Sequence, residues 1–321
     1  MRKAVLFYNP LSGRRRERRI SDIEKALTIL RSAGVDASAT PTRAASDAGD
    51  QVRAAIADGC YTIFACGGDG TVHDVLQGVV GTAVPLGIIP LGTANALACD
   101  LNLPMSPAAA ARAALTAEPR RIAVGRVEYL DFSGNRCSRY FTVAVGVGVD
   151  AHLFYKLNTG MKGRLGMAAY YAKAWHLWLT HRMRQFSAEY KDELGGVKHV
   201  NLTELLAVRI QNFGGVLREL APGASLERDD LRLVLCQTSS RIAYLKYVMR
   251  SLLGAAWQVR GVELTYARQI ACESLAVEDS GAVSSSEKVY IEADGELLGT
   301  LPAEISMAPD VAMLLVPTKQ Q

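Results

Sequence analysis

Residues 61–74 read YTIFACGGDGTVHD, an apolar run of strand length that leads into a glycine turn and then into a helix. Gly67, Gly68 and Gly70 carry no Cβ and can take positive φ, so backbone N–H groups can crowd against an anion at the start of that helix. Asp69 is the unusual member, because a carboxylate repels phosphates unless a divalent cation lies between them. The stretch therefore predicts either a nucleotide held as its Mg²⁺ complex or a carboxylate that orders the turn.

The same turn also has a purely structural interpretation. Many α/β domains join a strand to a helix through glycines for reasons of geometry alone. Two common phosphate-binding patterns do not apply. No Lys followed by Ser or Thr closes the turn as in a Walker A loop, and the spacing is not G-x-G-x-x-G.

Composition indicates an ordinary globular protein. The 321 residues have room for two domains of ~150 residues each. A hydrophobic content of 49% with a charged content of 21% excludes a chain that is mostly disordered. The formal net charge of +4 is too small to indicate a nucleic acid partner, although it favours an anionic membrane surface over a neutral one.

The cysteines and the apolar segments bear on the compartment. The six cysteines are scattered, without a C-x-x-C pair or a His at metal-ligand spacing, and predict core thiols in a reducing compartment. The apolar run at residues 4–8 is too short for a signal peptide core, and no segment reaches ~18 uninterrupted apolar residues. We therefore expect a cytoplasmic protein that does not span a membrane.

Strands and helices alternate through the first part of the chain, as a doubly wound parallel sheet requires. The pattern predicts an α/β nucleotide-binding domain over residues 1–121, with a helix that Ser21 caps and Gly34 ends. Turns at residues 67–71 and 92–95 would follow two of its strands, at the edge where open α/β sheets bind ligands. Strands are expected at residues 4–8, at 36–42 together with an edge turn, in the apolar run just before Gly67, and at 84–89.

From residue 122 the pattern changes to short strands separated by turn signals, which predicts a mainly β, sandwich-like second domain over residues 122–308. The closing run 311–316 fits a strand of either domain, so the sequence leaves open whether residues 309–321 join the first domain. Strands are expected at residues 122–129, 139–149, 200–210, 231–236, 262–267, 275–277, 289–293 and 297–301.

Three local signals occur in one order along the chain: NPLSG at residues 9–13, GGDGT at 67–71 and PLGTAN at 90–95. Together they resemble the catalytic domain of the diacylglycerol kinase and sphingosine kinase family of lipid kinases, in particular its soluble bacterial members. Weaker matches carry the resemblance over nearly the whole chain, through residues 140–141, 148–151 and 162–166, Asn212, and ADGE at 293–296.

The resemblance implies a two-domain, ATP- and Mg²⁺-dependent kinase that phosphorylates a lipid alcohol such as diacylglycerol at a membrane surface. In the family pattern, Glu296 would be the base that takes the proton of the lipid hydroxyl, with Asp294 beside it. Asp69 would organise the Mg²⁺, and a metal site of some bacterial relatives would fall near Asp229 and Asp230. The residues that would hold the nucleotide are Asn9, Ser12, Gly13, Thr42, Gly67, Gly68, Asp69, Gly70, Thr71, Asp74, Thr93 and Asn95.

Simpler interpretations stay open for several of these residues. Thr93 and Asn95 are also good helix N-caps. Asp294-Gly295 between two apolar runs is a common two-residue hairpin turn, and a hairpin tip is also an efficient place for a carboxylate. Two departures from the family stand out: Ala96 where an acidic residue is frequent, and Asp74 where Glu is more usual.

Two other functions remain open. An NAD kinase also carries Gly-Gly-Asp-Gly after a strand, although residues 9–13 and 90–95 favour the lipid relatives. A catalytically silent lipid or nucleotide sensor is the third hypothesis, and Ala96 is the feature that favours it. The sequence leaves the lipid and the oligomeric state open, with a homodimer among the alternatives.

Aromatic residues gather at residues 165–179 and 244–257, mixed with Lys and Arg. Such helices can lie in a lipid headgroup layer, while core packing is the commoner explanation for aromatic residues at helical spacing.

Overall fold

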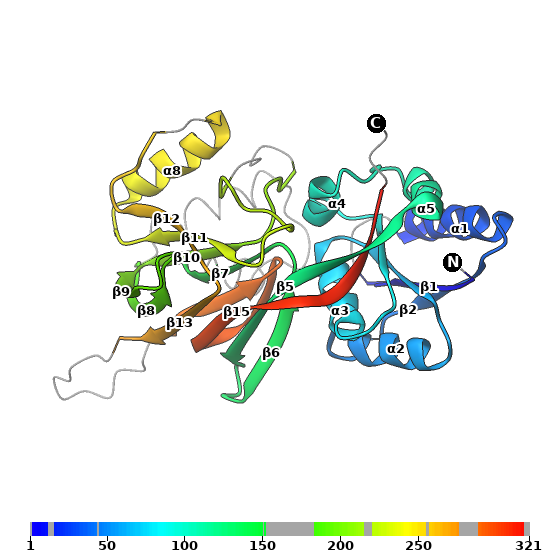
Figure 1. Ribbon diagram of the computed structural model, residues 1–321. Coiled ribbons are helices and arrows are strands. Elements are labelled where there is room, and N and C mark those ends of the chain that lie inside the picture. Colours follow the sequence, from blue (N-terminus) through cyan, green and yellow to red (C-terminus); the bar gives the residue numbers. More distant parts are fainter. Residues whose placement is uncertain are drawn as a thin grey trace. The chain divides into compact units, whose positions relative to one another are not determined.

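The computed structural model describes residues 2–11, 16–43, 45–149, 151, 183–214, 220–254, 257–275 and 288–317 (Figure 1). The chain divides into two compact units. Unit 1 comprises Met1–Val124, Ile210–Arg218 and Ala308–Gln321, and unit 2 comprises Gly125–Arg209 and Glu219–Met307. The domain limits expected from the sequence, 1–121 and 122–308 with the membership of 309–321 left open, stay a prediction.

Unit 1 is built on a parallel sheet with the strand order β2-β1-β3-β4-β15. The order reverses between β1 and β3, and such a switch point is where doubly wound sheets bind ligands, outside the carboxyl ends of the strands. Its elements are β1 (Lys3–Tyr8), α1 (Arg16–Ser32), β2 (Asp36–Pro41), α2 (Ala45–Ala57), β3 (Thr62–Gly67), α3 (Asp69–Val79), β4 (Leu86–Pro90), α4 (Ala96–Asp100) and α5 (Pro107–Thr116).

Helices cover both faces of this sheet (Figure 1). α1 and α5 lie together on one face, and α2 and α3 lie together on the other. On the α1 side, Leu6, Phe64 and Ile89 from three strands pack against Leu27 and Leu30 of α1 in one buried cluster. The central strands are therefore apolar on both faces, as the sequence of β3 predicts.

Unit 2 is mainly antiparallel β structure with one buried core. One run of strands has the order β12-β11-β10-β7-β14-β15, while β15 also pairs with β13, which leads to β8 and β9, and with β5, which leads to β6. Its elements are β5 (Glu118–Leu130), β6 (Arg136–Phe141), β7 (Ala144–Gly148), β8 (Phe186–Lys191), β9 (Val197–Leu202), β10 (Glu204–Val208), β11 (Leu231–Cys236), α8 (Arg241–Leu253), β12 (Val262–Ala267), β13 (Gln269–Ser274), β14 (Tyr290–Ala293) and β15 (Glu296–Val316).

The predicted fold class, a doubly wound α/β domain plus a mainly β domain, is confirmed. Two predicted strands each join two observed ones: 139–149 covers the end of β6 and all of β7, and 200–210 covers the end of β9 and all of β10. The helix start at Ser21 was wrong, since α1 begins at Arg16. β13 ends at Ser274, before the strand expected at 275–277, of which residues 276 and 277 lie outside the described residues.

The last strand settles the question left open for residues 311–316. β15 begins in unit 2, and Leu314 near its end pairs in parallel with Leu86 of β4 in unit 1. Within the described ranges, no helix combines the length and the apolar character that crossing a membrane requires.

Candidate active site

The glycine turn follows β3 directly and opens α3. Gly68 occupies the N-cap position, and its carbonyl accepts from the N–H groups of Thr71 at 3.0 Å and Val72 at 3.1 Å. The N–H groups in the first turn of an α-helix have no acceptor within the helix, and the helix dipole makes that end attractive to anions. The turn can therefore receive a phosphate group, as the sequence predicts.

The glycines are needed here for space and not for positive φ. Gly68 has a φ of −91°, and Gly70 lies in the first turn of α3. A Cβ on Gly67 would lie 2.2 Å from the Thr71 hydroxyl oxygen, so a larger residue would collide with that buried side chain. Gly67, Gly68 and Gly70 do not use the positive φ that glycine permits, so the turn depends on the absence of a Cβ, which allows close backbone approach.

A second turn, residues 91–95, lies against the first. The Leu91 N–H donates to the Gly67 carbonyl at 2.9 Å. A Cβ added to Gly92 would lie 2.3 Å from Cα of Gly68, and one added to Gly68 would lie 3.1 Å from Cα of Gly92. The two glycine turns thus meet through bare backbone at the carboxyl ends of β3 and β4.

Asn95 braces the second turn with its side chain. Its backbone is left-handed, with a φ of 50°. Its Oδ1 accepts from the Gly92 N–H at 2.9 Å, while its Nδ2 donates to the Gly92 carbonyl at 3.0 Å. Asn95 occupies the N-cap position of α4 without a capping bond from its side chain, so its amide shapes the turn, and Thr93 beside it is exposed.

Asp69 joins the starts of two helices. Its Oδ1 accepts a hydrogen bond from the backbone N–H of Ala96 at 2.7 Å. Asp69 lies in the first turn of α3, and Ala96 is the first residue of α4. The interpretation of Asp69 as a carboxylate that orders the turn is thereby supported by a specific contact, and its partly exposed position also suits a cation.

Other predicted nucleotide-binding residues lie near the sheet's switch point. Asn9 follows β1, where its Oδ1 accepts from the Leu11 N–H at 2.8 Å. Thr42 follows β2 and is buried, and its N–H donates to the Tyr8 carbonyl at 2.8 Å. Asp74 lies partly exposed on α3. Ser12 and Gly13 lie outside the described residues.

The hairpin β14–β15 in unit 2 carries the two predicted catalytic carboxylates. Ala293 pairs with Glu296, which leaves Asp294 and Gly295 as a two-residue turn with φ values of 50° and 82°. Positive φ at both positions is the type I′ geometry that Asp-Gly favours. The predicted hairpin is confirmed, and buried Glu292 reinforces it by accepting from the Gly295 N–H at 2.9 Å.

Asp294 and Glu296 have different surroundings. The buried Asp294 carboxylate accepts three backbone hydrogen bonds, from Thr142 at 3.1 Å, Val143 at 2.9 Å and Ala144 at 3.1 Å. Glu296 is exposed at the first position of β15. Asp294 thus anchors the hairpin, which holds Glu296 on a rigid element facing solvent.

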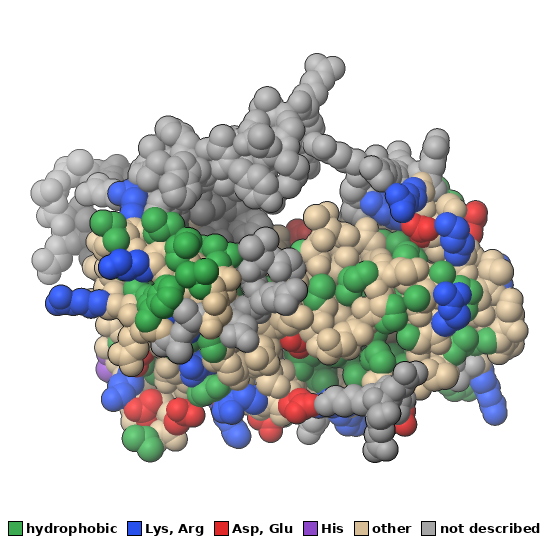
Figure 2. All heavy atoms as spheres, turned by 90° about the horizontal axis from the view of Figure 1, so that it is seen from above, with side chains coloured by type: hydrophobic (Ala, Val, Ile, Leu, Met, Phe, Trp, Pro, Cys, Tyr) green, Lys and Arg blue, Asp and Glu red, His purple; other side chains and the backbone are tan. Residues whose placement is uncertain are grey.

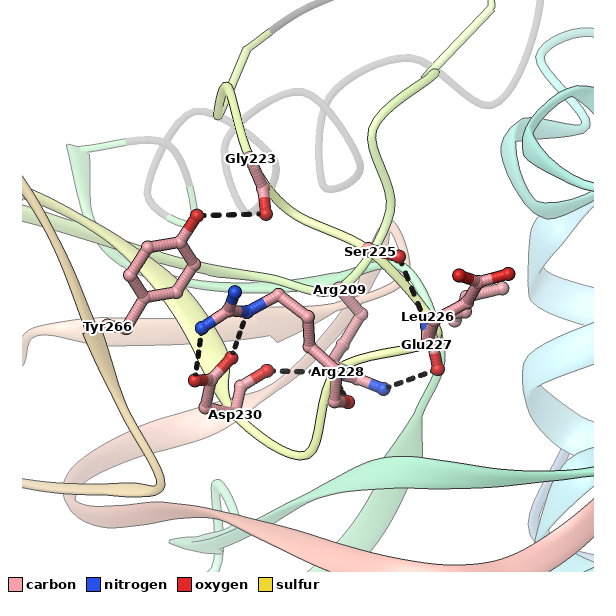
Figure 3. A network of polar contacts seen from close by, with 8 residues as sticks. All are labelled: Arg209, Gly223, Ser225, Leu226, Glu227, Arg228, Asp230 and Tyr266. Atoms are coloured by element: carbon pink, nitrogen blue, oxygen red, sulfur yellow. Dashed lines mark hydrogen bonds and ion pairs between the residues drawn. The ribbon is translucent and has the colours of Figure 1, made fainter. Parts of the chain in front are cut away.

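The loop that contains Asp229 is held by an internal cation (Figure 3). Arg209 is fully buried, and its guanidinium donates to the carbonyls of Arg228 at 2.8 Å, Asp230 at 2.7 Å and Leu226 at 3.3 Å. Burial lowers the pKa of Arg209 to about 10. The Asp230 carboxylate forms a two-point ion pair with Arg228, with both N–O distances 2.7 Å.

This geometry gives no support to a metal at Asp229, which is exposed. In the described part of the chain, no three His, Cys, Asp or Glu side chains cluster as a metal site would require. A nucleotide-borne Mg²⁺ is a different case, since it needs only one or two protein carboxylates beside the phosphates. Asp69, on a helix that begins at the glycine turn, fits that requirement.

The cysteines are core thiols, apart from Cys99 on α4, whose Sγ donates to the Ala94 carbonyl of the second turn at 3.7 Å. Cys66 lies on β3 immediately before the turn, and burial raises the pKa of its thiol. Burial likewise raises the pKa of Cys236 to about 12. All six thiols are free, which agrees with their interpretation as core residues, although Cys99 and Cys137 are only partly buried.

Comparison with known proteins assigns the chain to a family. The family model "diacylglycerol kinase catalytic domain" matches residues 3–127, and the model "YegS C-terminal NAD kinase beta sandwich-like domain" matches residues 143–316, more than half of the chain. The chain belongs to the YegS-like diacylglycerol kinase family. It is therefore a lipid kinase, and kinases of this family imply ATP as the phosphoryl donor.

Relatives align with this family member along almost their full length. A diacylglycerol kinase of Bacillus subtilis is 27% identical and aligns over 95% of this chain and 93% of its own. A diacylglycerol kinase of Mycobacterium tuberculosis is 29% identical over 98% of this chain and 95% of its own.

Solved structures agree in fold. A diacylglycerol kinase of Bacillus anthracis superposes with a TM-score of 0.67 and 18% identity, over 98% of this chain and 96% of that one. Yeast NADH kinase superposes with a TM-score of 0.52 and 11% identity, over 99% and 84% of the two chains.

The sequence did not reveal three groups that hold these loops: the Ala96 N–H, the Glu292 carboxylate and the Arg209 guanidinium. A backbone N–H donor cannot be identified from the type of residue that carries it. Glu292 and Arg209 could have been noticed, because each is a charged residue inside a strand-like apolar run, a position that normally requires a buried partner.

Proposed function

We propose that this lipid kinase transfers the γ-phosphoryl group of ATP to the hydroxyl of diacylglycerol, at a membrane surface with which it associates peripherally. The observation that carries the proposal is the alignment with relatives named diacylglycerol kinase over more than nine-tenths of both chains.

The glycine turns of unit 1 are proposed to bind the triphosphate. N–H groups at the start of α3 would donate to phosphate oxygens, and the Thr71 and Thr93 hydroxyls would add further donors. Asn9, Thr42 and Asp74 complete the proposed nucleotide site, together with Ser12 and Gly13. Asn95 contributes indirectly, by holding Gly92 in place.

Asp69 is the residue we propose for the Mg²⁺ that accompanies ATP. When bound, Mg²⁺ would neutralise phosphate charge and stabilise the charge that develops in transfer. The hydrogen bond from the Ala96 N–H fixes one carboxylate oxygen of Asp69 and so would orient the side chain for binding the Mg²⁺.

Glu296 is proposed as the base that receives the proton of the lipid hydroxyl. Phosphoryl transfer depends mainly on positioning and charge, and a positioned base contributes about 10²–10⁴-fold. Asp294 acts as a positioning residue, because three backbone N–H groups already occupy its carboxylate.

The experiment offers purified protein, labelled ATP and Mg²⁺ to diacylglycerol, ceramide, sphingosine, phosphatidylglycerol, a polyprenol and NAD separately. Label in diacylglycerol alone is expected. Label only in NAD would make the enzyme an NAD kinase, and no transfer to any acceptor would favour the silent sensor.

Variants of the hairpin test the roles. Glu296→Gln should lower transfer by about 10²–10⁴-fold while the melting temperature stays the same, because the residue is exposed. Glu304→Gln, an exposed residue farther along β15, is the matched control and should keep full activity. Near-normal transfer by Glu296→Gln would remove that residue from the mechanism.

A further inference from the structure

Helix α8 (Arg241–Leu253) exposes its apolar face and buries polar side chains. The side it buries carries Tyr247, Arg250 and Ser251. The side it exposes carries large apolar residues: Ile242 (67% exposed), Leu245 (41%), Val248 (39%), Met249 (43%), Leu252 (38%) and Leu253 (64%). A surface helix of a globular protein normally shows the opposite arrangement.

The exposed apolar residues form one continuous stripe. Ile242, Leu245, Met249 and Leu252 follow the spacing of residues that share one face of a helix, and Leu253 and Val248 flank them. Every other helix or strand of the described residues contributes at most one large exposed hydrophobic residue. Trp257, 44% exposed, lies just beyond the end of the helix.

Polar contacts hold α8 in place without help from this stripe. Ser240 accepts at the N-cap from the Ala243 N–H, and Gly254 ends the helix in the left-handed conformation. On the inner side, the Tyr247 hydroxyl donates to the Leu220 carbonyl, and the Tyr244 hydroxyl lies 2.7 Å from the Thr203 hydroxyl. These contacts use the two ends and the inner side of the helix, and the exposed apolar side chains take no part in them.

The charged residues of the chain segment that carries the stripe have one sign. Residues 231–262 contain five Arg or Lys and no Asp or Glu. Lys246 and Arg260 are exposed and Arg241 is partly exposed, whereas Arg250 packs inward over the Tyr247 ring. The nearest acidic side chain that follows, Glu263, accepts from Gln237 at 3.1 Å. Figure 2 shows hydrophobic side chains gathered on this part of unit 2, with Lys and Arg at their margin.

We propose that the outward face of α8 docks the enzyme on an anionic lipid surface, a proposal that rests on the proposed lipid substrate. An apolar stripe with basic neighbours is typical of a helix that lies in the headgroup layer. Lys246 can extend its ammonium to the headgroups while its carbon chain stays on the apolar side, and Trp257 suits the membrane interface.

The stripe fits a membrane better than a second copy of the chain. Thirteen residues make a helix only ~20 Å long. Six side chains on one face of it fall short of the roughly 800 Å² per partner that a stable protein interface buries. A bilayer accepts such a short helix because its apolar side chains need to penetrate only ~5–10 Å.

Flotation with vesicles tests the proposal on the full chain. We expect wild type to float with phosphatidylcholine vesicles that contain phosphatidylglycerol, and about tenfold less with pure phosphatidylcholine. The double variant Ile242→Ser/Leu253→Ser should lose about tenfold of the binding to anionic vesicles. Leu194→Ser, which removes a 96% exposed leucine elsewhere, is the matched control and should float as wild type does.

Lys246→Glu tests the charge. It should weaken flotation on anionic vesicles and leave the weak binding to neutral vesicles unchanged. Equal flotation of wild type and the double variant would overturn the proposal. Sedimentation would overturn it too if it showed a wild-type dimer that the double variant loses while its vesicle binding stays intact, because the stripe would then be a protein interface.

The outcome is separable from that of the kinase assay. The double variant should phosphorylate a short-chain diacylglycerol in solution at the wild-type rate, because α8 carries none of the proposed catalytic residues. Vesicle binding without transfer to any lipid would contradict the proposed function and leave the docking surface standing. Phosphoryl transfer to a lipid, with vesicle binding that does not depend on the stripe, would contradict the docking surface and leave the proposed function standing.

Discussion

The Asp69 carboxylate accepts a hydrogen bond from the backbone N–H of Ala96 at 2.7 Å. One side chain thereby connects the start of α3 with the start of α4. The donor is main chain, so alanine at residue 96, where the resemblance led us to expect an acidic residue, leaves this contact unchanged. The one residue that favoured a silent sensor therefore does not disturb the proposed Mg²⁺ carboxylate.

Charge and hydrogen bonding at Asp69 can be tested separately. Asp69→Asn keeps an oxygen that can accept from the Ala96 N–H and removes the charge. We expect transfer to fall by about 10²-fold or more, while stability drops only by the ~0.3–1 kcal/mol that a charge at a helix start contributes. Kinase assays and urea unfolding measure the two effects.

Asp69→Ala is the companion variant, since it removes the acceptor as well. It should lose a further ~1 kcal/mol or more of unfolding free energy, because the Ala96 N–H is left without its partner. Equal stability of the two variants would show that the hydrogen bond contributes nothing. Full activity of Asp69→Asn would end the assignment of Mg²⁺ to Asp69.

The contact between the two glycine turns predicts an order of severity for alanine substitutions. A Cβ on Gly92 would lie 2.3 Å from the Gly68 Cα and 2.7 Å from the Asn95 Oδ1, whereas one on Gly68 would lie 3.1 Å from the Gly92 Cα. Gly92→Ala should therefore lower the unfolding free energy by about 2 kcal/mol or more, and Gly68→Ala by clearly less. Thermal unfolding of the two variants, side by side, would contradict this packing if the order were reversed.

Local chemistry was predictable from the sequence, and distant partners were not. The Asp294-Gly295 turn follows from the backbone preferences of two adjacent residues. The anchor of Asp294 does not, because its partner Ala144 is 150 positions away. Likewise, the sequence predicted close backbone approach at the glycine turn, but not the contact of Gly68 with Gly92, because only the sheet brings the second turn near.

Helix α8 shows a different limit. The spacing of its apolar residues predicts a helix with one apolar face, but the same spacing results whether that face meets the core or the solvent. The commoner interpretation of the aromatic residues at 244–257, core packing, holds for buried Tyr247 and fails for exposed Trp257. The aliphatic residues Ile242, Leu245 and Met249 make up the exposed face. The inner face depends on Tyr247 and Arg250, whose partners come from other parts of unit 2.

Arg209 should be among the residues whose loss unit 2 tolerates least. Arg209→Met would leave the carbonyls of Leu226, Arg228 and Asp230 without their shared donor. We expect a loss of about 3 kcal/mol or more in unfolding free energy, because each buried carbonyl left without a donor costs about 1–3 kcal/mol. Urea unfolding measures it, with Arg228→Met as the control, because the half-exposed pair of Arg228 with Asp230 contributes only ~0–1 kcal/mol.

The same loop predicts the response to metal removal. Since a guanidinium holds its carbonyls, EDTA should leave the urea midpoint of the wild-type protein unchanged. A midpoint that falls with EDTA and recovers with added Mg²⁺ or Ca²⁺ would instead support the metal expected near Asp229. A small effect of Arg209→Met would show that water replaces the guanidinium at little cost.

The final prediction concerns pH and Asp100, the last residue of α4. Its Oδ1 accepts from the N–H groups of Gln211 at 3.0 Å and Asn212 at 2.9 Å, and burial raises the pKa of Asp100 above its ordinary 3.8 in spite of these bonds. The native state therefore binds the proton more tightly than the unfolded chain. This group adds stability as pH falls through the raised pKa, and the gain is complete below pH 3.8.

Asp100→Asn keeps an oxygen acceptor for both N–H groups and cannot titrate, so it should lack this gain. The stability of wild type minus that of Asp100→Asn should then rise as pH falls from neutrality toward 3.8. Asp131 and Asp192 work in the opposite direction, because hydrogen bonds from Asn135 and Gly196 lower their pKa values, and their stabilisation is lost in acid. Both proteins share those two groups, so the difference isolates Asp100. Urea unfolding across this pH range measures it, and a difference that stays flat or falls with acidification would mean that the two backbone hydrogen bonds outweigh burial at Asp100.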